Sequence, residues 1–97
     1  MRAVAAEFQM LDWKTSEGFF QALPRWVRDG TRRLDESASV RFVPRNEAED
    51  REAEFHVDSA IAPLHVHEGD WVLLFDDGTR GTMSDSAHRA LLGGGSL

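Results

Sequence analysis

The sequence predicts a small α+β domain: an antiparallel or mixed sheet of four to five short strands, a kinked helix near the N-terminus and a helix near the C-terminus. Several short runs alternate apolar and polar residues, as half-buried strands do, and two runs have helical spacing. A length of 97 residues suits one domain with one core, which we place at residues 1–92, followed by a flexible glycine-rich tail at 93–97.

The N-terminal third predicts a strand followed by a helix. Residues 3–11 alternate, with Phe8 on the apolar face. Ser16 has the chemistry of a helix N-cap, and apolar residues then recur at helical spacing from 19 to 27. Pro24 should kink this helix, or begin a second one at its first position, and Gly30 is a suitable stop.

The rest of the chain predicts further strands. Trp71–Phe75 is the strongest, and since it is apolar on both faces we expect it to be central in the sheet and covered on both sides. Residues 76–79 read as a tight hairpin. The weaker candidates are Ser39–Val43, Glu54–Asp58, 61–67 and Arg80–Met83.

A final helix is expected to follow the last strand. Ser84 is its predicted N-cap. The small and apolar side chains of Ala87, Ala90 and Leu91 are expected to dock it on the sheet. Glycines at 93–95 would end the helix.

Composition excludes several classes of function. The chain has no cysteine, which rules out disulfides, cysteine-type zinc sites and thiol catalysis and agrees with a reducing compartment. We expect neither a secretory signal, because Glu7 interrupts the first apolar stretch, nor a membrane span. A net charge of −6 disfavours direct nucleic-acid binding, although carboxylates can imitate phosphates.

Two histidines raise the question of a metal site. His65 and His67 are two residues apart on an expected strand, so they share a face and could meet one ion. After Asp70 the chain continues as an apolar strand without a ligand, and a third ligand from His56 or His88 would depend on the fold. We therefore expect a solvent-facing strand surface, keep the metal site as a weaker alternative, and expect no cofactor.

Other polar residues favour structural roles over catalysis. Asp70 follows a glycine in a turn, where its carboxylate is expected to accept backbone N–H groups. Ser84, Asp85 and His88 are the residue types of a hydrolase triad, but one helical turn cannot give them the required geometry. The sequence therefore predicts that the protein is not an enzyme.

Arginines gather around the end of the first helical region. Guanidinium groups bind phosphates and carboxylates well, so this patch could hold a nucleotide-like anion or an acidic partner. The alternative is a solvated helix face whose arginines pair with Asp29, Asp35 and Glu36. The candidate binding residues are Arg25, Trp26, Arg28, Arg32 and Arg33.

Two further features are candidates for contact with a partner. Trp13 lies in a predicted turn, either as a lid on the core or as an exposed anchor. The charged run at 45–54 is expected to be a solvated loop, or else an acidic surface that occupies a nucleic-acid groove on a host protein. Its carboxylates are Glu47, Glu49, Asp50, Glu52 and Glu54.

The order of these parts resembles a group of small bacteriophage and prophage proteins, the PGDYG-type group. Residues 5–9 are similar to its opening strand, 19–27 occupy its helix position, 68–73 (EGDWVL) are similar to its Gly-Asp-aromatic turn and strand, and 84–92 to its last helix. The chain departs from the pattern at Glu68, where proline is usual, in the returning strand RGTM and throughout 31–54. The resemblance implies a compact α+β fold and a phage or prophage setting, and it implies no catalytic residues.

These observations favour a non-enzymatic phage or prophage accessory protein that binds a host or phage protein in the cytoplasm of a bacterial host. Binding energy would come from a few aromatic and arginine anchors. The alternatives are a protein that holds a nucleotide-like anion on the Arg25 to Arg33 patch, and a structural component of the virion. A metal-dependent enzyme built on His65 and His67 has the least support, and a homo-oligomer stays open.

Overall fold

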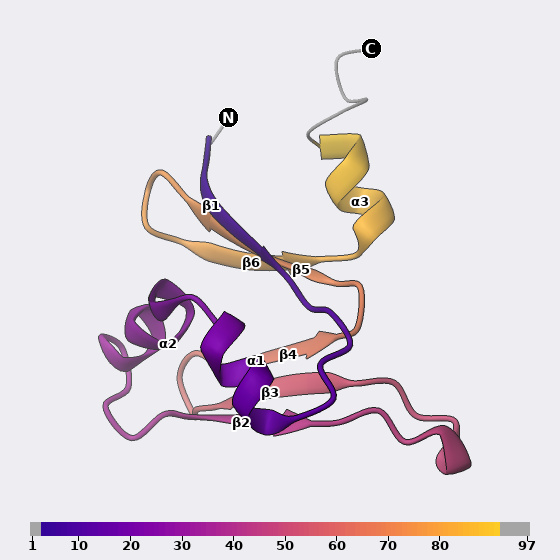
Figure 1. Ribbon diagram of the computed structural model, residues 1–97. Helices are drawn as coiled ribbons and strands as arrows, with labels where there is room; N and C mark the ends of the chain where they lie inside the picture. Colours follow the sequence, from indigo (N-terminus) through magenta and orange to yellow (C-terminus); the bar gives the residue numbers. More distant parts are fainter. Residues whose placement is uncertain (1–2, 92–97) are drawn as a thin grey trace.

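The computed structural model describes residues 3–91 and shows an α+β fold in which two three-stranded antiparallel sheets lie one above the other (Figure 1). The fold class is confirmed, but the strand count and the single sheet are wrong, because all the candidate runs form strands and these divide between two sheets. The elements are β1 (Val4–Gln9), α1 (Ser16–Ala22), α2 (Arg25–Arg32), β2 (Ser39–Val43), the 3-10 helix η1 (Glu47–Glu49), β3 (Glu54–Asp58), β4 (Leu64–His67), β5 (Trp71–Phe75), β6 (Arg80–Met83) and α3 (Asp85–Arg89).

The first sheet has the order β1-β5-β6, with β5 in the centre. Neighbouring residues on a strand point to opposite faces, and both Val72 and Leu73 are completely buried. The expectation that this strand is central and covered on both sides is therefore confirmed. Its inner face lies toward the second sheet, and α3 lies beyond its outer face (Figure 1).

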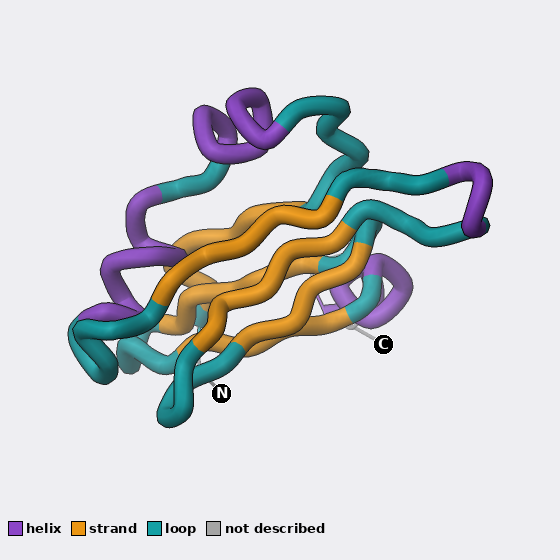
Figure 2. The backbone as a smooth tube through the Cα atoms, turned by 90° about the horizontal axis from the view of Figure 1, so that it is seen from below, coloured by secondary structure: helices purple, strands orange, loops and turns teal. Residues whose placement is uncertain are grey.

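The second sheet has the order β2-β3-β4. Phe42, Phe55 and Val66 are buried on its inner face. Seen from below, its outer face has no helix across it (Figure 2). His65 and His67 are exposed there, as expected. Only one face of this sheet is therefore part of the core.

An aromatic cluster joins the two sheets to α1. Phe8 of β1 meets Phe55 of β3 edge to face, with ring centroids 6.1 Å apart. Phe19 of α1 stacks on Phe42 of β2 at 4.7 Å and is fully buried. Trp13 covers this cluster by stacking on Phe8 at 5.8 Å. Of the two roles considered for Trp13, the packing supports the lid on the core.

The N-terminal helical region is two helices and not one kinked helix. Leu23 ends α1 in an extended conformation, and Pro24 precedes α2 as its N-cap, one position earlier than expected. Thr15, not Ser16, caps α1, accepting the N–H of Gly18 at 3.0 Å. The predicted stop at Gly30 is also wrong, because α2 continues to Arg32.

Helix α3 has the expected N-cap, but a different residue from those expected docks it on the sheet. Ser84 accepts the N–H of Ala87 at 3.2 Å. Ala87, Ala90 and Leu91 are exposed, so the prediction that they dock the helix is wrong. His88 does so instead, with only 7% of its surface exposed. The predicted tail at 93–97 lies outside the described residues.

The turns at two glycines have the backbone conformation that the sequence predicts. Gly69 and Gly78 have φ of 90° and 87°, and Gly78 lies in the predicted hairpin between β5 and β6. The charged run at 45–54 is largely exposed, as expected, and contains η1 and an isolated bridge between Asn46 and Arg51. No helix within residues 3–91 is long and apolar enough to cross a bilayer.

Candidate functional site

The arginines of α2, and Arg33 directly after it, do not form the ion pairs considered above with other parts of the described chain. Within residues 3–91, no carboxylate forms an ion pair with Arg25, Arg28, Arg32 or Arg33. Asp35, a partner considered above, instead accepts hydrogen bonds from Ser37 and Ser59. The arginines elsewhere in this part of the chain are bonded: Arg41 to Asp58, Arg45 to Glu68 and Asp12, Arg51 to Glu49, Arg80 to the carbonyl of Val27, and Arg89 to Asp85.

Three of these unpaired arginines border a hollow beside α2. Its volume is about 510 Å³, and its walls include Arg25, Arg28 and Arg32. The guanidinium of Arg28 also lies over the ring of Phe20, 5.6 Å from its centroid. Asp29 contributes a carboxylate to the same hollow. The predicted basic patch thus exists as a surface feature, with an aromatic ring at one side.

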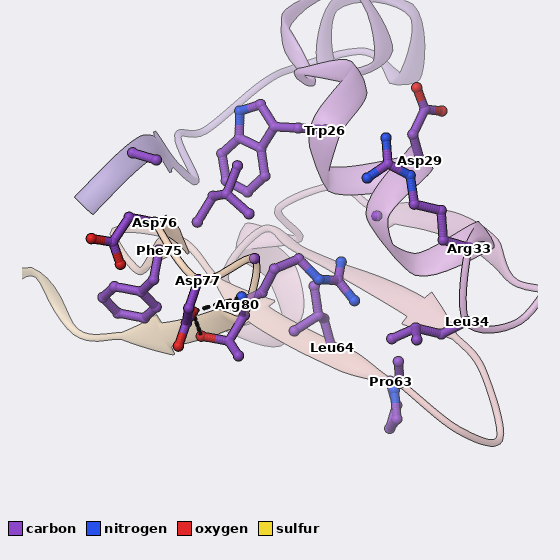
Figure 3. A pocket seen from close by; sticks show the side chains of 16 residues that line it. Trp26, Asp29, Arg33, Leu34, Pro63, Leu64, Phe75, Asp76, Asp77 and Arg80 are labelled. Carbon is purple, nitrogen blue, oxygen red and sulfur yellow. Dashed lines mark hydrogen bonds between the residues drawn. The ribbon is translucent and has the colours of Figure 1, made fainter. Parts of the chain in front are cut away.

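An adjacent face of α2 borders a larger and more apolar hollow of about 1000 Å³ (Figure 3), and Asp29 lines both hollows. Trp26 lies on its α2 side, and Leu64 and Phe75 come from the two sheets. Arg33 and Leu34 line it where the chain leaves α2. Trp26 and Arg33 therefore belong to this hollow, while the other arginines of the patch border the smaller one.

Arg80 connects β6 to α2 within the larger hollow. Its Nη1 donates to the carbonyl of Val27 at 2.9 Å, and its side chain passes beside Gly30. Burial in this position lowers the pKa of Arg80 below its ordinary value. Arg80, Leu34 and Leu64 could not be recognised as site residues from the sequence, because they come from separate elements and show no shared local pattern.

The acidic segment divides into an exposed part and one partly buried residue. Glu47, Glu49, Asp50 and Glu52 are exposed around η1. Glu54 instead belongs to β3, where only 19% of its side chain is exposed. The proposed acidic surface is therefore smaller than expected, and Glu54 lies in a different environment.

Glu54 lies among three histidines on the outer face of the second sheet. Antiparallel pairing sets Glu54 opposite His67, and His56 opposite His65. His56 Nε2 is 2.7 Å from Glu54 Oε1. Partial burial acts to raise the pKa of Glu54, but the hydrogen bond and charge of His56, with those of His65, outweigh it and lower the pKa. Glu54, His65 and His67 offer potential metal-ligating atoms within 4.8 Å of one another.

The residues considered for catalysis have structural contacts. Asp70 accepts the backbone N–H of His67 at 3.2 Å, as its turn position predicts. His88 Nε2 lies 2.7 Å from Glu7 Oε2, while Ser84 caps its helix. Ser84 and His88 are therefore engaged in different contacts.

No protein-family model matches the chain, and neither a curated protein nor a solved structure matches it significantly. The resemblance to the PGDYG-type group stays a prediction, and the geometry of the surface is the remaining guide to function.

Proposed function

We propose that this protein is a non-enzymatic binding module that engages an acidic, partly apolar segment of a partner protein through α2. The observation that carries the proposal is that Arg25, Arg28, Arg32 and Arg33 form no ion pair within residues 3–91, on a chain whose net charge is −6. Because the chain has more Asp and Glu than Lys and Arg residues, intramolecular ion pairs with these arginines would have been possible. Carboxylates of a partner would complement this surface.

The second requirement on the partner is an apolar side chain near its carboxylates. The larger hollow beside α2 offers Trp26, Leu34 and Leu64 as apolar walls. Tryptophan and arginine are enriched among the residues that dominate binding energy at interfaces. A segment in which Asp or Glu alternates with aromatic or aliphatic residues would contact both hollows beside α2, its carboxylates at the arginines and its apolar side chains at the larger hollow.

The setting of this activity is proposed from the resemblance alone. A phage or prophage accessory protein would meet its host or phage partner in the bacterial cytoplasm. The neighbouring genes test this directly, because lysis, packaging and early-control regions imply different partners. A chromosomal neighbourhood without phage genes would contradict it and leave the proposed binding chemistry to be judged by itself.

A peptide-display selection tests the binding chemistry. The folded protein should enrich peptides that combine carboxylates with aromatic or aliphatic residues. Synthetic versions of these peptides should bind more weakly as salt rises. The variant that combines Arg25→Gln, Arg28→Gln and Arg32→Gln should lose at least about tenfold in affinity, which corresponds to about 1.4 kcal/mol.

A control variant removes the same charge elsewhere. Arg41→Gln, Arg51→Gln and Arg89→Gln together delete three exposed arginines outside α2. This variant should bind the selected peptides like the unmodified protein. Equal losses in both variants, or enrichment of peptides without carboxylates, would contradict the proposal.

A nucleotide-like anion is the second candidate, favoured by the three arginines around the smaller hollow and by the nearby ring of Phe20. Titration with ATP, followed by tryptophan fluorescence and thermal shift, separates the two candidates. Saturable ATP binding that the α2 variant loses would favour the anion site over the peptide site.

A further inference from the structure

We propose that Glu54, His65 and His67 form a site for a divalent transition-metal ion on the outer face of the second sheet. The site is independent of α2 and of its proposed partner. The inference rests on strand register, on distances between ligating atoms, and on the groups that hold the ligands in place.

Strand pairing explains how the three ligands meet. His65 and His67 share the outer face of β4 because side chains alternate along a strand. Glu54 lies directly opposite His67 on β3, so its carboxylate reaches the same face. Strand positions are rigid compared with loop positions, which favours a site built on them.

The spacing of the ligating atoms suits a small cation. His65 Nε2 lies 3.6 Å from Glu54 Oε1, and His67 Nε2 lies 3.6 Å from Glu54 Oε2. Ligand atoms in a tetrahedral zinc site with bonds of about 2.0–2.2 Å are themselves about 3.3–3.6 Å apart. Both imidazoles are about half exposed, so small rotations can bring their nitrogens to an ion beside the carboxylate.

Two neighbouring groups position the ligands. His56 Nε2 lies within hydrogen-bond distance of Glu54 Oε1, 2.7 Å, and its ring lies beside that of His65 with centroids 4.0 Å apart. Asp70 Oδ2 lies 3.7 Å from Nδ1 of His67, the ring nitrogen that is not directed at Glu54. A carboxylate beside the second nitrogen of a ligating histidine is a frequent feature of metal sites. His56 and Asp70 are therefore positioning residues.

The ligand types decide which ions the site prefers. Two imidazole nitrogens and one carboxylate oxygen suit Zn²⁺, Co²⁺, Ni²⁺ and Cu²⁺, whereas Mg²⁺ and Ca²⁺ prefer oxygen ligands alone. Three protein ligands leave at least one coordination position for water or for a donor from another molecule.

Binding of ZnCl₂ and CoCl₂ to the full chain, produced without a histidine tag, tests the site. Calorimetry should show one equivalent of Zn²⁺, with no comparable binding of MgCl₂. Co²⁺ should produce visible absorption bands of a nitrogen- and oxygen-ligated ion. Nuclear magnetic resonance of the imidazoles should show Zn²⁺-dependent shifts at His65 and His67, while the buried His88 stays unchanged.

Variants connect the binding to these residues. His65→Ala with His67→Ala should abolish stoichiometric binding, and Glu54→Gln should weaken it at least about tenfold. His56→Ala should weaken it by a similar factor through loss of positioning. Asp58→Asn is the matched control, because Asp58 is an exposed carboxylate on the same face of β3. Melting in EDTA checks that each variant is folded.

Two results would overturn the proposal. One is the absence of stoichiometric Zn²⁺ binding to the unmodified chain. The other is binding that survives the double histidine variant. Neither result would affect the proposed peptide site, which uses other residues on α2.

Discussion

The imidazole of His88 lies flat on the indole of Trp71, with ring centroids 3.7 Å apart and planes within 3° of parallel. Each of the two residues also has a carboxylate partner on the other side of this contact. His88 Nε2 is 2.7 Å from Glu7 of β1, and Trp71 Nε1 donates to Asp85 of α3 at 2.9 Å. Through these contacts a five-residue helix is attached to the outer face of the first sheet. A short helix of this kind depends on tertiary packing, because isolated helices of this length are unstable.

His88→Ala should therefore release α3 and destabilise the protein by about 2 kcal/mol. This figure combines aromatic stacking, about 0.5–1.5 kcal/mol, with a hydrogen bond to a carboxylate, about 1.5–3 kcal/mol, partly recovered by hydration. Urea unfolding followed by tryptophan fluorescence measures the loss. His88→Phe keeps the ring and loses only the contact with Glu7, so its cost should lie between zero and that of His88→Ala. Equal stability of all three proteins would contradict the assigned role.

Phe19→Ala should be among the most destabilising single substitutions. Phe19 is completely buried and contacts the rings of Phe42 and Phe55 on the inner face of the second sheet. Truncation of a buried phenylalanine costs about 3–5 kcal/mol through lost burial and the cavity that remains.

Phe20 is the matched control for Phe19. It is the next residue of α1, and 37% of its surface is exposed. Phe20→Ala should cost clearly less than Phe19→Ala, since more of the Phe20 side chain is already exposed to solvent and its removal leaves no closed cavity. Chemical denaturation of both variants measures the difference in their free energies of unfolding. A comparable loss of stability in the two variants would contradict the assignment of Phe19 to the core.

Asp35 should contribute stability that depends on pH. Its carboxylate accepts hydrogen bonds from Ser37 Oγ at 2.7 Å and Ser59 Oγ at 2.8 Å, and these bonds lower the pKa of Asp35 in the folded protein. A carboxylate with a lowered pKa stabilises the fold above its unfolded pKa, about 3.9, and loses this effect as the pH falls through the folded value.

Asp35→Asn should accordingly lower Tm at pH 7 and have a progressively smaller effect below about pH 4. Thermal melts of the two proteins between pH 7 and pH 2.5 provide the measurement. Glu36→Gln is the control, because Glu36 is exposed and is the next carboxylate in the chain. A Tm difference for Asp35→Asn that stays constant over this range would contradict the role of the carboxylate.

The strands could be predicted from the sequence because their alternation is local. Ser39–Val43, Glu54–Asp58 and Trp71–Phe75 have the same bounds in the structure as in the prediction. Their division into two sheets could not be predicted, because it depends on the pairing of β1 with β5, more than sixty residues away. The docking of α3 was missed for a related reason. Apolar residues were expected to dock it, whereas a buried histidine with a ring and a carboxylate as partners does so.

The candidate sites, too, could be predicted only where their residues lie close together in the sequence. The arginine patch lies on one helix and its members could be recognised together. The proposed metal ligands come from two strands, and the sequence groups Glu54 with the acidic loop because its neighbours in sequence are acidic. Once β3 and β4 are paired in register, Glu54 lies opposite His67. Strand pairing is the information that single-sequence reasoning lacked.

Two glycines should respond to alanine in opposite directions, because they differ in backbone conformation. Gly78 has φ of 87°, and an added Cβ there would meet no atom within 4 Å. Gly78→Ala should therefore destabilise the protein by about 1–2 kcal/mol, purely through backbone strain. Gly30 lies in α2, and a Cβ would be 3.5 Å from Arg80 Cδ, an ordinary contact.

Gly30→Ala should stabilise the protein by about 0.5–1 kcal/mol, because alanine loses less conformational entropy in a helix than glycine does. Urea midpoints of the two variants, measured beside the unmodified protein, should shift to opposite sides of it. A loss of stability in Gly30→Ala would show that Arg80 cannot tolerate the added methyl group. A neutral Gly78→Ala would show that the hairpin relaxes into another turn. Because the two substitutions add the same methyl group, their difference isolates the effect of backbone conformation.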